Sequence, residues 1–288
     1  MEANRQSPEI ETIIKQYEQL TAVSEVILGG NLHVGYWPDG DRGSGSMREA
    51  TDRLTDLLAE ELGVRPGQRI LDAGCGTGRP ALRLARTRRV DVLGVDISPG
   101  HVKQTTDHAR EEGLSEQVTA EQADVMDLPF PDASFDAAWA VESLPHVPDR
   151  VRALGEIRRV LRPGGRVVFT ICVERRPVSA PVREFLTDYY DTVNATYPPL
   201  ASVPGMVVDA GLELVRLTDI GENIFSTMAR VKEGFDEAAE DLESSVGLPR
   251  ERTEKIARHA LRFGELPESG YAVVVARRPV TWSSVDPT

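Results

Sequence analysis

The sequence contains few cysteines, few aromatic residues and no long apolar run. Two of its 288 residues are cysteines, Cys75 and Cys172, which excludes a disulfide framework and fits the reducing cytoplasm. No apolar run is long enough to span a membrane, and residues 1–28 lack the pattern of a signal peptide. We therefore expect a soluble cytoplasmic protein that does not act at a membrane.

Basic residues are also in short supply. The chain has 33 Lys and Arg against 46 Asp and Glu, which gives a formal net charge of -13, and it has no long Lys/Arg block. Such a chain repels the phosphate backbone of a nucleic acid, so we do not expect a nucleic-acid partner. The length fits one large domain, or one domain with a cap, around a substantial core.

What the sequence does contain is a glycine-rich loop directly after a short apolar run. Residues 68–71 predict a buried strand, residues 72–78 read D-A-G-C-G-T-G, and apolar positions from Ala81 to Ala85 predict a helix. A strand, a glycine loop and a helix in this order place backbone N–H groups at the carboxyl end of a strand, where α/β folds bind ligands. We therefore expect the cofactor at this loop.

The spacing of the glycines bears on which cofactor binds. A dinucleotide fingerprint reads G-x-G-x-x-G, whereas this loop reads G-x-G-x-G and has Arg79 where the third glycine would fall. Asp72 lies two residues before the first glycine. A carboxylate here favours a ligand that carries an ammonium group and repels a diphosphate.

A second acidic residue ends the next predicted strand, residues 90–96. Asp96 follows Gly74 at about the 20-residue spacing at which an acid accepts hydrogen bonds from ribose hydroxyls. A dinucleotide and other nucleoside cofactors all carry a ribose, so Asp96 alone does not identify the cofactor. It could instead cap the following helix, although Ser98 is the better cap.

These residues resemble the first motifs of the class I S-adenosylmethionine (SAM)-dependent methyltransferases. The resemblance implies a Rossmann-like, seven-stranded, mostly parallel α/β sheet with an antiparallel last strand, N-terminal helices and a helical cap. It implies that the glycine loop makes room for the methionine end of SAM, that Asp72 reaches its amino group, and that residues after the second and third strands contact the adenine. The cofactor-binding residues expected on this basis are Asp72, Gly74, Gly76, Gly78, Asp96, Ile97, Asp124, Val125, Tyr17, His33, Tyr36 and Trp37.

The last four of these residues come from the N-terminal region. Residues 8–28 carry an apolar stripe at helical spacing, which could cover the active site or pack against a second subunit in a homo-oligomer. Residues 30–38 read G-N-L-H-V-G-Y-W-P and resemble the segment that folds over SAM in small-molecule methyltransferases. The alternative is a hydrophobic plug on the core.

The fourth predicted strand covers residues 137–142, and the segment that follows it indicates the kind of methyl acceptor. It lacks the Asn/Asp-Pro-Pro-aromatic tetrad of DNA and many protein methyltransferases, and its Ser-Leu-x-His form resembles enzymes that act on small metabolites. His146 is the candidate catalytic base because an imidazole titrates near neutrality. Glu142 is a second catalytic candidate, as a base or a substrate-orienting group. His146 could instead be held by loop carbonyls. The other histidines of the predicted helices, His101, His108 and His259, are expected at the surface.

The complete interpretation is a SAM-dependent methyltransferase that acts on a small, apolar or ring-bearing natural product. Aromatic residues cluster in two insertions that can roof the acceptor, although they could equally form only the core of a cap. No residues show the spacing of a metal site, so none is assigned, and a magnesium requirement stays open. The rival functions are an RNA or protein methyltransferase, a non-catalytic SAM-binding protein and a dinucleotide enzyme.

The expected division of the chain is 1–45 for the N-terminal helix and active-site cover, 46–173 for the cofactor-binding core, 174–201 for a cap insertion, 202–220 for the rest of the core, 221–270 for a helical cap, and 271–288 for the last strand and tail.

Overall fold

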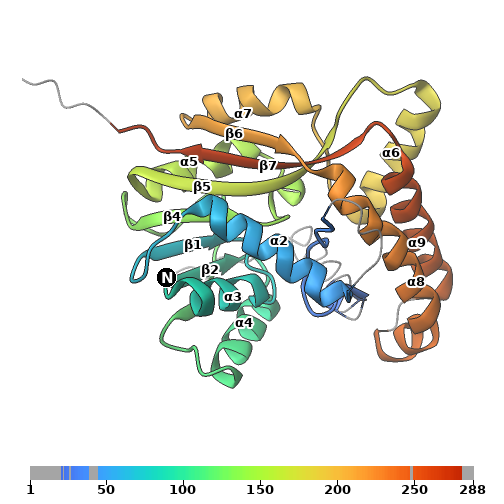
Figure 1. Cartoon of the computed structure of the whole chain (residues 1–288), viewed down its shortest axis with the longest axis horizontal. Coiled ribbons are helices and arrows are strands. Elements are labelled where there is room, and N and C mark those ends of the chain that lie inside the picture. The colour runs from blue at the N-terminus through green and yellow to red at the C-terminus, as the bar shows by residue number, and fades with distance from the viewer. Residues whose placement is uncertain (1–20, 22, 26, 39–44, 247–248, 281–288) are drawn as a thin grey trace, which may run out of the picture.

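The computed structural model describes residues 21, 23–25, 27–38, 45–246 and 249–280. Its centre is a seven-stranded sheet in the order β3-β2-β1-β4-β5-β7-β6 (Figure 1). β1 to β5 pair in parallel, whereas β7 runs antiparallel to both β5 and β6. The predicted sheet with an antiparallel last strand is confirmed. The strands are β1 (Arg69–Ala73), β2 (Asp91–Asp96), β3 (Val118–Gln122), β4 (Phe135–Ala140), β5 (Leu161–Glu174), β6 (Glu213–Asp219) and β7 (Ser269–Arg277).

The central strands are apolar on both faces because helices cover both faces of the sheet. α2 (Met47–Leu62) and α3 (Arg79–Arg88) pack on one face through buried leucines, and one residue of α4 (Pro99–Glu111) joins the same cluster. α5 (Arg150–Val160) and α7 (Val203–Asp209) pack on the other face. Burial of each large aliphatic side chain contributes about 1.5–3 kcal/mol, so these two clusters hold the core together.

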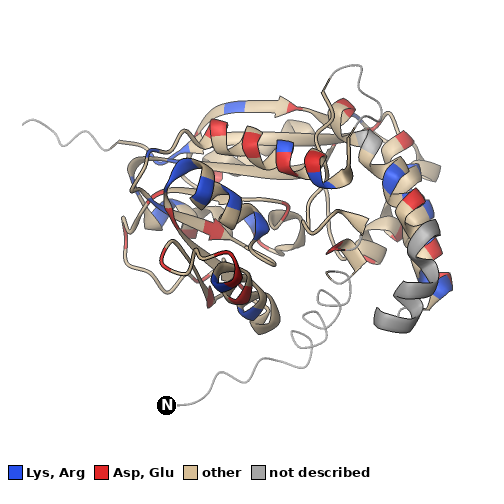
Figure 2. Cartoon of the chain, turned by 60° about the horizontal axis from the view of Figure 1, so that its bottom comes forward, with Lys and Arg blue, Asp and Glu red and all other residues tan. Residues whose placement is uncertain are grey.

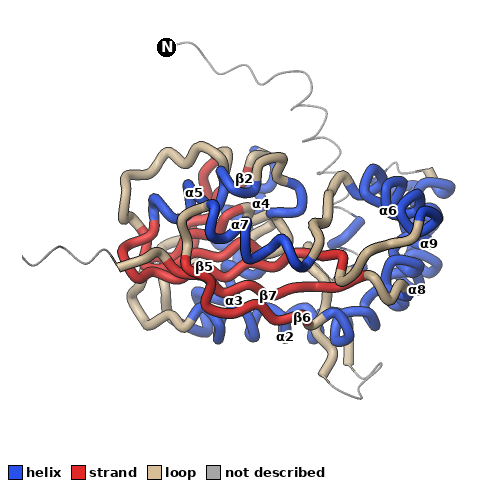
Figure 3. The backbone as a smooth tube through the Cα atoms, turned by 90° about the horizontal axis from the view of Figure 1, so that it is seen from above, coloured by secondary structure: helices blue, strands red, loops and turns tan. Residues whose placement is uncertain are grey.

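A helical cap lies at one end of the sheet. α6 (Ala180–Val193) follows the carboxyl end of β5, α8 (Gly221–Val246) follows β6, and α9 (Arg250–Glu265) leads into β7. The three helices gather beyond the carboxyl ends of the parallel strands in both views (Figures 1 and 3). Ligands bind at this end of an open α/β sheet, so the cap lies where it can cover a bound molecule.

The fourth strand ends two residues earlier than the sequence pattern predicts. β4 stops at Ala140, and Glu142 adopts a left-handed backbone conformation with a φ of 52°. The backbone N–H of Glu142 donates to the side chain of Thr170 at 2.9 Å, so it leaves the strand ladder. The chain then enters a short 3-10 helix, η1 (Leu144–His146), and a second one, η2 (Leu200–Ser202), precedes α7.

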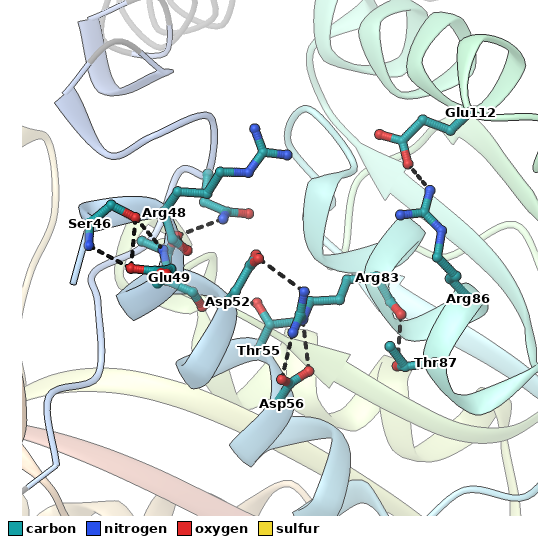
Figure 4. A network of polar contacts seen from close by, with 12 residues as sticks. Ser46, Arg48, Glu49, Asp52, Thr55, Asp56, Arg83, Arg86, Thr87 and Glu112 are labelled. Atoms are coloured by element: carbon teal, nitrogen blue, oxygen red, sulfur yellow. Dashed lines mark hydrogen bonds and ion pairs between the residues drawn. The ribbon is translucent and has the colours of Figure 1, made fainter.

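Charged residues form pairs over the surface. Figure 2 shows acidic and basic residues interspersed along the helices. In one network, Arg83 of α3 donates to Asp56 at 2.7 and 2.6 Å and to Asp52 at 2.9 Å, which joins α3 to α2 (Figure 4). No helix within the described ranges is long and apolar enough to cross a membrane.

Candidate active site

The glycine loop leaves β1 through backbone conformations that only glycine adopts without strain. Gly74 has a φ of 83°, and a Cβ built on it would lie 2.4 Å from the Cβ of Ser143. Gly76 has a φ of 53°, and its Cβ would lie 2.7 Å from Leu32. Gly78 then serves as the N-cap of α3. The loop is therefore pressed between the segment after β4 on one side and the N-terminal segment on the other.

Asp72 lies at the end of β1 with its side chain buried. The pKa of its carboxyl group is raised to about 7. Burial is the main cause, the nearby charge of Asp96 contributes to the rise, and the side chain of Trp139 opposes it. A cationic group beside Asp72 would favour the charged form. In the same loop, the buried hydroxyl of Thr77 has no hydrogen-bond partner among the described residues.

Asp96 lies at the end of the neighbouring strand β2. Its Oδ2 accepts from the backbone N–H of Gly76 at 2.9 Å, and its Oδ1 accepts from the N–H of Ser98 at 2.9 Å. The hydroxyl of Ser98 accepts from the N–H of His101 and caps α4, so Ser98 rather than Asp96 is the helix cap. The carboxylate of Asp96 thus faces the glycine loop.

The ends of β2 and β3 lie side by side. The side chain of Gln122 donates to the carbonyl of Ile97 at 3.0 Å, and the N–H of Ala123 donates to the carbonyl of Asp96 at 3.1 Å. The carboxylate of Asp124 accepts from the N–H of Met126 at 2.8 Å. The structure thus brings Ile97 and Asp124 to one edge of the sheet, where Val125 is half-buried beside Asp124.

The N-terminal segment, residues 27–38, crosses this end of the sheet and is fixed by α2 and α8. His33 is buried, with Nδ1 2.9 Å from the carbonyl of Val34 and Nε2 3.0 Å from Thr55. Burial lowers the pKa of His33 to about 4, so the ring is neutral near pH 7. The indole of Trp37 donates to Thr227 of α8 at 2.9 Å. These contacts anchor the segment to the core.

The remaining predicted residues of this region differ in what they touch. Tyr36 is half-buried, and its backbone N–H donates to Ala50 of α2 at 2.9 Å. Tyr17 lies outside the described residues. Leu32, which was not among the predicted site residues, contacts the glycine loop at Gly76. Only its position within residues 30–38, the segment expected to fold over SAM, could have indicated it.

Glu142 joins three distant parts of the chain. Its Oε1 accepts from the backbone N–H of Val34 at 2.9 Å and from the hydroxyl of Tyr271 on β7 at 2.8 Å. Burial raises the pKa of Glu142 to about 7, and these two hydrogen bonds oppose the rise. Glu142 therefore ties the N-terminal segment to the sheet beside the glycine loop.

His146 follows at the end of η1. Its Nδ1 lies 2.9 Å from the carbonyl of Asn194, in the loop after α6. The protein around the ring desolvates it and lowers its pKa, and the positive charge of Arg150 adds to this effect, although part of the side chain is accessible to solvent. The N–H of Thr196 donates to the carbonyl of Pro145 at 3.0 Å, so this loop is docked on η1.

The prediction that His101 lies at the surface is wrong. Only 6% of the residue is exposed, because its face of α4 turns toward Asp96 and Thr21. His108 and His259 are also partly buried, His108 beside the glycine loop and His259 against Phe185. Within the part of the chain that the structure describes, no three His, Cys, Asp or Glu residues form a group that could hold a metal ion.

Comparison with known proteins shows what kind of site this is. Residues 71–169 match a family described as a methyltransferase domain. The protein is 35% identical over 267 residues to methyltransferase GfsG of Streptomyces halstedii, covering 91% of this chain and 92% of GfsG. It is 36% identical to the 27-O-demethylrifamycin SV methyltransferase of Amycolatopsis mediterranei, with 92% and 96% covered. The chain belongs to the class I SAM-dependent methyltransferases.

Solved structures agree with this assignment. The methyltransferase matches the crystal structure of the [4+2]-cyclase SpnF with a TM-score of 0.83 and 32% identity, over 93% of this chain and 96% of that one. It shares its fold with the mycolic acid cyclopropane synthase CmaA1, with a TM-score of 0.83 at 14% identity over 95% and 100% of the two chains. The predicted fold, the SAM cofactor and the methyltransferase activity are confirmed, whereas the individual site residues stay predictions.

The cofactor side of the methyltransferase fits SAM chemically. The buried carboxyl group of Asp72 has a raised pKa, which a neighbouring ammonium group would reverse. Asp96 is suited to accept hydrogen bonds from a ribose. The helix N-terminus at Gly78 and the unpaired hydroxyl of Thr77 offer further polar groups at the same loop.

An aromatic cluster lies on the cap side of the methyltransferase. The ring centroids of Tyr189 and Phe263 are 4.9 Å apart, those of Tyr190 and Tyr197 are also 4.9 Å apart, and Tyr197 lies 5.3 Å from Phe263. The cluster reaches Cys172 at the end of β5, and the thiol pKa is raised by burial and by the charge of Glu142. These rings therefore extend from the cap to the neighbourhood of Glu142.

Proposed function

We propose that this methyltransferase transfers the methyl group of SAM to a hydroxyl oxygen of an apolar, ring-bearing natural product. The observation that carries the proposal is the aromatic cluster of α6, α9 and the loop after α6. Its member Tyr197 lies near Glu142, and His146 contacts Asn194 of the same loop. Apolar and aromatic walls with few polar groups suit such a ligand. The names of two relatives, the 27-O-demethylrifamycin SV methyltransferase and O-methyltransferase resE of Aspergillus sclerotiorum at 34% identity, favour transfer to oxygen.

Bound SAM supplies a methyl group that is already activated by its sulfonium, so the enzyme contributes mainly alignment and exclusion of water. In our proposal, Asp72 binds the ammonium group of the cofactor and Asp96 binds its ribose. Leu32 and the glycine loop lie in contact, and this contact would keep water away from the donor side. The aromatic cluster would align the acceptor from the opposite side.

His146 is the proposed base. A carbonyl can only accept a hydrogen bond, so the contact with Asn194 fixes Nδ1 as the protonated nitrogen, and the neutral ring then has its lone pair on Nε2. The lowered pKa keeps His146 neutral at pH 7 and able to accept a proton there. Glu142 accepts two hydrogen bonds from the protein, so we assign it the role of holding Val34 and Tyr271 beside the acceptor.

The test is mass spectrometry of a panel of hydroxylated polyketides and terpenoids incubated with the enzyme and SAM. Methyl transfer to oxygen adds one methylene, about 14 Da, and NMR locates the new methoxy group. A gain of mass at carbon or nitrogen would contradict O-methylation.

The likeness to a [4+2]-cyclase supports a second candidate function, a cyclisation catalysed by the methyltransferase fold. Such a reaction would change the NMR spectrum of a substrate without any change in its mass.

His146→Gln tests the proposed base. Removal of a general base slows turnover by about 100-fold to 10,000-fold, so we expect a fall in kcat of at least 100-fold. The affinity for S-adenosylhomocysteine (SAH), measured by calorimetry, should stay within about twofold of the native value, because His146 contacts the loop after α6 and is proposed to act on the acceptor. An unchanged kcat would remove His146 from the mechanism.

A further inference from the structure

We propose that His101 is a positioning residue that couples Thr21, six residues before the N-terminal segment, to the carboxylate of Asp96, so that docking of the chain at Thr21 and binding of the cofactor ribose reinforce each other. The inference rests on the proposed placement of the ribose at Asp96. It assigns a role to a buried histidine that methyl transfer itself does not use.

The geometry is a continuous chain of three side chains. Nδ1 of His101 lies 3.2 Å from Oδ1 of Asp96, and its Nε2 lies 2.8 Å from the hydroxyl of Thr21. His101 and Thr21 are each only 6% exposed, so water does not readily replace either contact. Thr21 belongs to the helical residues that precede the N-terminal segment, 80 positions away from His101 in the sequence.

The acceptor oxygens of Asp96 determine which nitrogen of His101 donates and which accepts a hydrogen bond. A carboxylate accepts, so Nδ1 of His101 carries the proton that faces Asp96, and in the neutral ring Nε2 accepts from the hydroxyl of Thr21. Oδ1 of Asp96 therefore receives hydrogen bonds from His101 and from the backbone of Ser98. A shift of Thr21 would turn the ring and disturb the carboxylate, and a carboxylate held by a ribose would fix the ring in turn.

A second contact brings the same N-terminal region to the same point. Leu32 packs on Gly76, and the N–H of Gly76 donates to the other oxygen of Asp96 at 2.9 Å. The N-terminal region thus reaches Asp96 by two routes, one through His101 and one through the glycine loop. Any buried histidine needs polar contacts, so it is the convergence of both routes on Asp96 that indicates the coupling.

The two nitrogens of His101 can be tested separately. His101→Asn retains a donor at the position of Nδ1 and removes the link to Thr21, whereas Thr21→Val removes only the hydroxyl at the other end. We expect each variant to weaken SAH binding by about threefold to tenfold, the range of one hydrogen bond. The double variant should be no weaker than either single one, because both break the same link.

Thr253→Val is the matched control. Thr253 is also a buried threonine, 2% exposed, but it lies on α9 and its hydroxyl donates to Arg250. This variant should bind SAH as the native protein does. Additive losses in the double variant, or native affinity in Thr21→Val, would overturn the coupling.

Hydrogen exchange provides a readout that does not depend on methyl transfer. In native protein, SAH should slow amide exchange across residues 27–38, and in Thr21→Val this protection should be reduced while the protection of the glycine loop persists. Equal protection in both proteins would contradict the inference. Failure of the proposed function would look different, as SAH binding and protection without any O-methylated product.

Discussion

The two sides of the active site are built from different materials. On the cofactor side, carboxylates and backbone N–H groups from residues 72–125 form hydrogen bonds at the ends of three adjacent strands. On the proposed acceptor side, aromatic rings from α6, the loop after it and α9 pack against one another, and nearby Glu142 accepts a hydrogen bond from Tyr271 of the antiparallel strand β7. The hydrogen-bonding groups of the cofactor side suit one ligand of fixed shape. Substitutions among the aromatic rings of the proposed acceptor side would leave those groups in place.

The largest effect that we expect comes from the cofactor side. Asp96→Asn removes the negative charge that faces Gly76 and the proposed ribose, and hydrogen bonds to charged groups contribute about 1.5–3 kcal/mol each. With two ribose hydroxyls affected, SAH should bind at least 100-fold more weakly by calorimetry. Asp124→Asn, two residues after the end of β3, is the control for a lost carboxylate at this edge and should weaken binding less. Near-native SAH affinity in Asp96→Asn would refute the assignment of the ribose.

Features of the cofactor side that arise from neighbouring residues could be predicted from the sequence, whereas features that depend on distant residues could not. The glycine loop was predictable because one strand, one turn and one helix create it, and Asp96 because it ends the strand that follows. All of these elements lie within a short stretch of chain. His101 was misplaced because a polar side chain on a predicted helix was expected to be solvated, and the covering residue, Thr21, is 80 positions away. The early end of β4 was missed because it depends on the backbone at Glu142, which bonds a side chain of β5.

The acceptor side was predicted only in composition. Tyr189 and Tyr197 were visible as aromatic residues of an insertion, but their contacts with Phe263 arise from the packing of α6 and the loop after it on α9, which no local pattern encodes. The link from Glu142 to Tyr271 likewise requires the register of β7 beside β5. Long-range pairings of this kind are set by the folded core and not by periodicity.

A change in the aromatic cluster should affect the acceptor alone. Tyr197→Leu removes a ring that lies 4.9 Å from Tyr190 and 5.3 Å from Phe263, so an aromatic acceptor would lose part of its wall. We expect the KM for the acceptor to rise by about tenfold, in the range of one aromatic contact, with the Kd for SAH unchanged. Tyr197→Phe keeps the ring and should stay within twofold of the native KM. A parallel loss of SAH affinity in Tyr197→Leu would show that the two sides are not independent.

Glu142→Gln should change stability in a pH-dependent way. The pKa of Glu142 is raised from 4.5 to about 7 in the folded protein, so the folded state retains a proton that the unfolded state loses as the pH rises between these values. The native protein is therefore destabilised by this group as the pH rises through that window, by about 1–2 kcal/mol after allowance for partial exposure, and a glutamine is not. Its amide oxygen can still accept from Val34 and Tyr271.

The measurement is the difference in Tm between Glu142→Gln and the native protein at pH 5 and at pH 8. The difference should become more favourable to the variant at pH 8. Asp72, whose pKa is also raised, is present in both proteins and cancels in the comparison. A pH-independent difference would mean that Glu142 is ionised throughout, as a group that faces the acceptor and water would be.

The smallest expected effect lies outside both sides, at the surface network of α2 and α3. Arg83→Gln breaks ion pairs with Asp52 and Asp56 (Figure 4), but these side chains are about one-third exposed, and such pairs contribute about 0.2–1 kcal/mol. The buried leucines of the two helices keep their contacts in the variant, so α3 should stay in place behind the glycine loop. Urea unfolding should show this small loss at about 0.1 M salt and less of it at 1 M, where charges are screened. Since α3 begins at Gly78, a several-fold loss of SAH affinity in Arg83→Gln would show that the cofactor side depends on a remote surface contact, and that its local motif alone is not sufficient.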